Sequence, residues 1–220
     1  MYTILELFDL SHTAAAEYLS AFTYPFEALP GIKKLILELG SALPVEEYDH
    51  PAEDVWIAKD AVIYPNNYIA GPNIIGHRTE VRPGAFIRGA ALVGDDCVIG
   101  NSTELKNVIL FDHVQVPHYN YVGDSILGYH SHMGAGSITS NVKGNSSLVV
   151  IHDGSSKVET GMKKVGAFLG DFAEIGCGSV LNPGTVIGRN TQIYPLCSIR
   201  GVIPADSICK NSTDIIEKRV

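Results

Sequence analysis

The chain has 220 residues, 45% hydrophobic and 18% charged, which is enough apolar material for a packed core and argues against disorder. The formal net charge is −8, so we expect no nucleic-acid partner, and an anionic ligand needs local basic clusters. The four cysteines form no C-x-x-C pair, and no apolar run reaches membrane-spanning length. The N-terminus lacks the basic region of a signal peptide, so we expect a cytoplasmic protein with reduced thiols and no membrane partner.

Residues 1–50 differ in pattern from the rest and are predicted to form a small helical cap. Segments 11–23 and 30–41 are predicted helices. The second carries apolar residues at helical spacing on one face: Ile32, Leu35, Ile36 and Leu39. We expect these helices to cover the first coil of a repeat structure, because both ends of a solenoid need covering.

From residue 57 onward, large aliphatic residues recur at every sixth position. The first run is Ile57, Ile63, Ile69, Ile75, Val81, Ile87, Val93, Ile99 and Leu105, and the second is Leu169, Ile175, Leu181, Ile187, Ile193 and Ile199. Neither a helix nor an ordinary strand produces a period of six. The pattern predicts a parallel β-helix over residues 51–205, with three short faces per turn and the aliphatic side chains stacked inside.

Two further positions repeat with the ladder. Glycine often follows the aliphatic residue, at Gly76, Gly94, Gly100, Gly128, Gly134, Gly170, Gly176 and Gly188. Glycine there permits a positive φ angle at a corner. Small residues recur four positions after the aliphatic residue; Cys97 and Cys197 are among them and are expected to fill small inward slots.

The ladder has two kinds of irregularity. The steps from Leu105 to Leu110 and from Val122 to Leu127 are five residues long. The ladder is absent from 140–164, which predicts an inserted loop, and long loops in compact repeats are often functional. Residues 206–220 carry a weak helical signal and are expected to form a short C-terminal helix.

Polar residues that break the repeat mark where chemistry is expected. They stand in and around 82–85, 100–107 and 117–124, and at the two ends of the inserted loop. Taken singly, each has an ordinary structural explanation: a solvent-facing charge, a contact with a neighbouring subunit or a solvated loop end.

Together, the motifs resemble a known family. Five stretches are similar, in order, to the acetyltransferase domain of the bifunctional N-acetylglucosamine-1-phosphate uridyltransferase/glucosamine-1-phosphate acetyltransferase: RPGA (82–85), GNSTELKN (100–107), HYNYVGDS (118–125), GAGSITSN (134–141) and KKVGAFLGDFAEIGCGSVLNPGTVIG (163–188). The resemblance implies a left-handed β-helix, a homotrimer with active sites between subunits, and acetyl-CoA as co-substrate with no metal. No Gly-rich nucleotide loop precedes residue 57, so we expect no uridyltransferase activity.

The resemblance also implies roles for individual residues. His118 resembles the general base, and imidazole can accept a proton from a sugar amine near neutral pH. Asn141 resembles the amide that holds the reacting amine. Arg82 and Lys106 resemble the basic pair that binds the sugar phosphate through charge-assisted hydrogen bonds. Tyr121 resembles a further substrate contact.

The remaining expected contacts include one departure from the family. Lys164 aligns with a lysine that reaches the ligands from the loop. The resemblance places Ala135, Cys177 and Pro195 at the cofactor. His132 stands where the family commonly has Asn, which leaves open whether the amino-sugar phosphate is a glucosamine or a galactosamine derivative.

Alternative functions remain open at this point. A non-catalytic β-helix that binds a sugar phosphate or serves as a scaffold would tolerate the changes at His132 and in the loop. A zinc enzyme like the γ-class carbonic anhydrases would use His77, His113 and His118 as ligands. An acyltransferase of the same fold could also act on another amine or on a hydroxyl.

Overall fold

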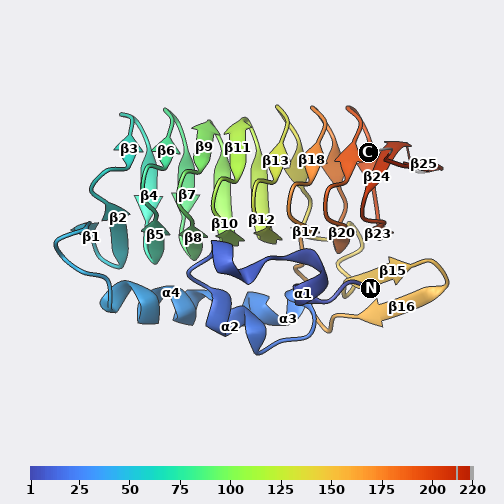
Figure 1. Cartoon of the computed structure of the whole chain (residues 1–220), viewed down its shortest axis with the longest axis horizontal. Coiled ribbons are helices and arrows are strands. Elements are labelled where there is room, and N and C mark those ends of the chain that lie inside the picture. The colour runs from blue at the N-terminus through green and yellow to red at the C-terminus, as the bar shows by residue number, and fades with distance from the viewer. Residues whose placement is uncertain (212, 219–220) are drawn as a thin grey trace.

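The computed structural model describes residues 1–211 and 213–218 and shows a parallel β-helix with a helical layer along one side (Figure 1). The coils contribute to a 14-stranded sheet and a nine-stranded sheet, and a separate two-stranded hairpin lies beside them. The parallel β-helix predicted from the period of six is therefore confirmed. No helix in the described ranges has both the length and the apolar character needed to cross a bilayer.

The helical elements all precede residue 42. The helices are α1 (Ile4–Leu7), α2 (Ala16–Ser20), α3 (Pro25–Ala28) and α4 (Ile32–Ser41), with 3-10 turns at Leu10–His12 and Leu29–Gly31. The larger sheet contains β1 (Tyr48–Ala52), β2 (Val55–Ala58), β4 (Tyr68–Ala70), β5 (Asn73–Ile75), β7 (Phe86–Arg88), β8 (Ala91–Val93), β10 (Glu104–Leu110), β12 (Tyr121–Leu127), β14 (Ile138–Thr139), β17 (Ala167–Leu169), β19 (Val180–Leu181), β20 (Thr185–Ile187), β22 (Ser198–Ile199) and β23 (Val202–Ile203). The nine-stranded sheet contains β3 (Val62–Ile63), β6 (Glu80–Val81), β9 (Val98–Asn101), β11 (Gln115–His118), β13 (His132–Met133), β18 (Glu174–Ile175), β21 (Gln192–Ile193), β24 (Ser207–Asn211) and β25 (Asp214–Glu217). The hairpin pairs β15 (Val150–Asp153) with β16 (Ser156–Glu159).

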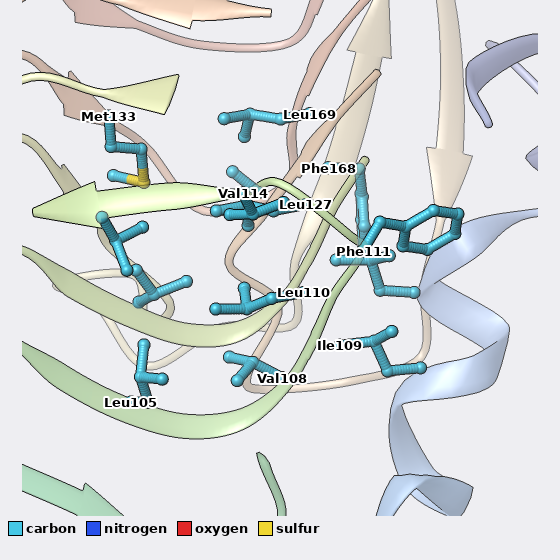
Figure 2. Packing of buried hydrophobic residues seen from close by; sticks show 14 of the residues in the cluster. Leu105, Val108, Ile109, Leu110, Phe111, Val114, Leu127, Met133, Phe168 and Leu169 are labelled. Carbon is cyan, nitrogen blue, oxygen red and sulfur yellow. The ribbon is translucent and has the colours of Figure 1, made fainter. Parts of the chain in front are cut away.

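The aliphatic ladder forms the interior of the coil. Successive strands pair in parallel, so that Ile57, Ile75, Val93, Leu110 and Leu127 occupy one row. The four that follow Ile57 are at most 1% exposed. Figure 2 shows further side chains of this core, which Phe111 and Phe168 extend toward the helical layer. Each coil buries its apolar residues against its neighbours, so stability is shared along the stack. Cys97 and Cys197 are buried, as expected for inward slots.

The helical layer does not occupy the expected position over the first coil. Helix α4 contacts β5, β8 and β10, which belong to three successive coils, and the helices run along the side of the stack (Figure 1). Ile32 and Ile36 are fully buried there, because the apolar stripe of the helix lies on the sheet. On the first coil, Val62 is 50% exposed and Ile63 is 37% exposed. The prediction of helices was right, and the prediction that they cap the end of the solenoid was wrong.

The expected C-terminal helix is also wrong. Strands β24 and β25 form an antiparallel hairpin in which Ile208 pairs with Ile216 and Cys209 with Ile215. The strand β21 offers unpaired backbone groups to β24, and the β-branched Ile215 and Ile216 favour an extended chain. Of the expected 206–220 segment, residues 212 and 219–220 lie outside the described residues.

The repeated glycines serve close backbone approach, and the expected positive φ angles lie elsewhere. A Cβ at Gly100 would overlap the backbone of Pro117 in the next coil, and one at Gly76 would overlap Gly94. The positive φ angles at the corners are carried mainly by non-glycine residues such as Asp96 and His113, at 54° and 60°. The glycine pattern therefore reports the tight stacking of coils.

The two five-residue steps coincide with shortened corners. In the preceding coil, two residues at this corner, Gly89 and Ala90, separate strand β7 from β8. Strands β10 and β12 instead continue through the corner, and only one residue of each is left out of the pairing between them. Those residues are Asn107 and Asp124, with φ angles of 55° and 48°. The shortened corner places two polar side chains where the preceding coil carries Gly89 and Ala90.

The inserted loop is folded onto the coil. It begins with a bridge between Val142 and Lys164 and continues as the β15–β16 hairpin. Val149 and Ile151 are fully buried, and Gly184 of the coil lies close to both. The loop is thus held by its own apolar residues, which fixes both of its ends at the corner that Asp124 occupies.

Candidate functional site

Asp124 is the centre of a polar cluster at the shortened corner. Asp124 is 4% exposed, and its carboxylate oxygens accept hydrogen bonds from Lys106 Nζ at 2.9 and 3.1 Å. Asn107 Nδ2 donates to it at 2.9 Å, and Asn141 Nδ2 donates at 2.5 Å. A buried carboxylate needs such partners, because an unpaired charge is costly away from water. This cluster therefore holds Lys106 and Asn141 in one place.

Tyr121 joins the same cluster from the start of β12. Asn141 Nδ2 donates to its hydroxyl at 3.1 Å. Burial raises the pKa of Tyr121, and the negative charges of Asp124 and Glu104 raise it further. The hydroxyl lies over Gly123, where a Cβ would overlap it. The phenol is thus held protonated and presents a hydroxyl beside the amide of Asn141.

Lys164 lies at the closing end of the inserted loop, next to this cluster. Lys164 forms an antiparallel bridge with Val142, the residue that follows Asn141. The next residue, Val165, donates its N–H to Asn141 O at 3.0 Å. The Lys164 side chain is exposed. The fold therefore brings four of the predicted residues, Lys106, Tyr121, Asn141 and Lys164, to a single corner.

A second group of predicted residues lies at a different corner. His118 ends β11, and Gly136 N donates to His118 O. Gly178 N donates to Ala135 O and Leu196 N donates to Cys177 O, each at 2.8 to 2.9 Å. Parallel pairing thus places His118, Ala135, Cys177 and Pro195 in one row across four coils. All four are exposed, so they form a continuous track on the surface.

Arg82 belongs to this second corner but lies two coils from His118. It follows Val81, which pairs with Ile99, which in turn pairs with Val116. Two strand spacings correspond to about 10 Å. The Arg82 guanidinium contacts Glu80, with Nε 3.2 Å from Oε1, and both side chains are about one-third exposed. The pair is therefore open to exchange with a solvent-borne anion.

His132 lies on the nine-stranded face, apart from both groups. Its Nδ1 is 2.8 Å from Glu174 Oε2 in the next coil. In the preceding coil, His132 pairs with Gln115, which lies three residues before His118. His132 therefore lies three positions along the strand from the exposed row that contains His118. The structure thus gives His132 an acidic neighbour that the sequence did not suggest.

Asp124 is the residue that the sequence reasoning missed. It stands in the stretch HYNYVGDS, which the family resemblance includes, but no role followed from the motif. The available signal was its position inside the second five-residue step, two residues after Val122, where that step begins. A shortened corner projects its side chain toward the neighbouring coils, and that contact depends on the three-dimensional path.

The three histidines considered as zinc ligands lie apart within the chain. His77 contacts Asp60 at 2.9 Å, and His113 stacks on His130 at 4.5 Å between ring centroids. His118 is at the opposite end of β11 from His113. Across residues 1–211 and 213–218, no group of three or more His, Cys, Asp or Glu side chains is placed to bind a metal.

Comparison with known proteins finds one matching family and several bifunctional relatives. Residues 69–156 match the family described as "GMPPB C-terminal domain". The bifunctional protein GlmU of Methanococcus aeolicus is 35% identical over 70% of this chain and 41% of its own length. The bifunctional sugar-1-phosphate nucleotidylyltransferase/acetyltransferase of Sulfurisphaera tokodaii is 32% identical over 64% of this chain and 35% of its own. The motif-based resemblance to the bifunctional family is confirmed by these relatives.

The relatives are longer than this chain, and the similar solved structures are distant. The chain spans 32% of the Methanococcus maripaludis relative and 41% of the Methanococcus aeolicus one. A perosamine N-acetyltransferase from Caulobacter crescentus, solved with CoA and GDP-perosamine, is 17% identical with a TM-score of 0.39, over 74% of this chain and 55% of that one. A hexapeptide transferase family protein from Anaplasma phagocytophilum is 15% identical with a TM-score of 0.43, over 76% and 80%. Similarity at this level carries no functional argument.

Proposed function

Because the chain carries a GlmU-like hexapeptide β-helix, we propose that it is an acetyl-CoA-dependent N-acetyltransferase whose acceptor is an amino-sugar phosphate resembling glucosamine 1-phosphate. The observation that carries this proposal is the Lys106–Asp124–Asn141–Tyr121 cluster, together with the exposed row that starts at His118. The first gathers groups suited to a phosphorylated sugar. The second offers a base beside a surface track long enough for an extended cofactor.

The reaction follows from the chemistry of these groups. The acceptor amine must be neutral to attack the thioester carbon of acetyl-CoA. His118 takes a proton from the nitrogen as the new C–N bond forms. The tetrahedral intermediate then expels the CoA thiolate, and His118 can return the proton to that sulfur. The amide of Asn141 accepts from the amine through Oδ1, while its Nδ2 stays bonded to Asp124 and Tyr121.

The basic residues supply the affinity for the phosphate. Lys106 is 24% exposed, so one face of its ammonium remains accessible while the other contacts Asp124. Arg82 can exchange the exposed Glu80 carboxylate for a phosphate, which accepts two parallel hydrogen bonds from a guanidinium. In a chain of net charge −8, these local cations determine where an anion binds.

The separation of the two groups supports a homotrimer. His118 ends a strand of the nine-stranded sheet, whereas Asp124 lies at the next corner, beyond the short run of β12 that begins at Tyr121. Within one chain the two groups face different edges of the prism. We propose that three prisms pack around an axis, so that the His118 corner of one subunit faces the Asp124 corner of its neighbour.

Activity with a panel of acceptors tests the proposal. Thiol release from acetyl-CoA is measured with glucosamine 1-phosphate, galactosamine 1-phosphate and the unphosphorylated amino sugars. We expect turnover with a phosphorylated amine, and loss of at least about a hundredfold in kcat for His118→Ala with an unchanged oligomeric state. Full activity of His118→Ala would refute the assignment of the base.

A sugar-phosphate-binding β-helix without catalysis is the second candidate. The observation in its favour is that Lys106 and Asn141 already bond to Asp124, so the cluster is complete without a ligand. This candidate predicts binding of amino-sugar phosphates in calorimetry but no thiol release with any acceptor. Thiol release that saturates with the acceptor concentration rejects it.

A further inference from the structure

The helical layer carries an apolar groove that the β-helix leaves open. Helices α2 and α4 form its two sides, no residue of the coils lines it, and the hollow has a volume of about 630 Å³. Leu35 and Leu39 line it from α4, and Tyr18 and Phe22 line it from the α2 side. These residues are spaced four apart on each side, so each helical segment presents one face to the groove.

The geometry of the groove favours a helix as its occupant. Its walls carry small exposed residues, Ala14 and Ala21 on one side and Ala42 on the other. Small residues at the walls let a third helix approach within the 8–10 Å typical of packed helices. The polar atom of Tyr18 is already satisfied, since its hydroxyl donates to Ala28 O at 2.5 Å. The floor of the groove is therefore apolar and suits the apolar stripe of an amphipathic helix.

The charge around the groove favours a partner that carries a positive charge. Glu17 and Glu38 line the groove and are exposed, and Lys34 pairs with Glu38 at 3.4 Å. Residues 1–50 contain eight carboxylates and two lysines, so this segment contributes −6 to the net charge of −8. Such a surface repels a second copy of itself and anionic lipid, and it attracts a basic partner.

We propose that this groove, defined by Tyr18, Phe22, Leu35 and Leu39 with Glu17 and Glu38 at its rim, binds a basic amphipathic helix of another protein. The occupant has apolar residues at helical spacing facing the floor and Lys or Arg flanking them, opposite the two glutamates. No residue of the Asp124 cluster or of the His118 row lines the groove. The inference does not depend on the proposed acetyl transfer.

A displayed peptide library provides the test. Peptides of about 18 residues, roughly five helical turns, are displayed on yeast with the positions of one face and its flanks randomised. The full-length protein is the labelled target. We expect enrichment of sequences with apolar residues at i, i+3, i+4 and i+7 and a net positive charge. Their binding should weaken by about tenfold with Ala21→Arg or Ala42→Arg, and should fall with salt.

The controls separate the groove from the rest of the layer. Ser20→Arg adds the same charge at an exposed position of α2 outside the groove and should leave binding within about twofold. Failure to enrich any helical pattern, enrichment of acidic peptides, or equal binding to both groove variants overturns the proposal. It is also overturned if Ala21→Arg dissociates an assembly of the protein in sedimentation, because a second copy then occupies the groove.

Discussion

Replacing Asp124 with Asn probes the centre of the polar cluster with almost no change in shape. Asp124 has a φ angle of 48°, a left-handed conformation that Asn tolerates well, so the backbone of the corner should be preserved. The substitution removes the negative charge beneath Lys106 and replaces one acceptor oxygen with an amide donor. That donor meets Asn107 and Asn141, which are themselves donors to this position.

The expected cost follows from the burial of the pair. Breaking a fully buried ion pair costs about 3–5 kcal/mol. Lys106 is 24% exposed and can regain some water, so we expect the low end, about 3 kcal/mol of unfolding free energy. For a chain of this length, 1 kcal/mol corresponds to about 2–4 °C in Tm, which gives a decrease of about 6–12 °C.

Calorimetry at matched protomer concentration measures the change, because an assembled protein has a concentration-dependent Tm. A double-mutant cycle with Lys106→Met isolates the pair, and we expect a coupling of about 1–3 kcal/mol. Asn107→Ala serves as a matched control, since it removes a neutral donor to the same carboxylate and should cost less. A Tm for Asp124→Asn within 1 °C of the wild type, or additive effects of Asp124→Asn and Lys106→Met, would falsify the reasoning.

Three further outcomes are expected. Gly100→Ala should lower Tm by several degrees or prevent folding, because the new methyl overlaps the backbone of the next coil, whereas Gly144→Ala, in open space, should melt like the wild type. All four cysteines are in the described part of the chain, and Cys177 alone is exposed. Native protein should therefore react with one equivalent of maleimide, and acetyl-CoA should slow this reaction if the His118 row holds the cofactor. A second thiol that reacts equally fast would contradict the fold. Burial and the neighbouring His113 lower the pKa of His130 from its usual 6.5, so the native state resists its protonation and stability should be lost as the pH falls below about 6.5. His130→Asn, which suits the positive φ there, should flatten that loss in urea melts at pH 7.5 and 5.5, and an unchanged pH dependence argues against the effect.

The sequence determined the coil because the repeat is local information. Each coil buries its aliphatic residue against the next, so a period of six in the chain becomes a row in space without knowledge of any distant contact. The same regularity explains why the residues of the His118 row, to which the family resemblance pointed, lie side by side: equal spacing aligns equivalent positions of successive coils. Motif resemblance then pointed to Arg82, Lys106 and Asn141 as residues of interest.

Only the tertiary structure decided how the irregular parts pack. Helix α4 contacts β5, β8 and β10 of three successive coils, so the helical layer lies along the stack, an arrangement that no local pattern in residues 1–50 reveals. The tail became a hairpin because β24 offers its outer edge to β25. The role of Asp124 depends on a corner that is shorter by one residue. That defect is visible in the sequence as a five-residue step, but the direction in which it turns a side chain is set by the neighbouring coils.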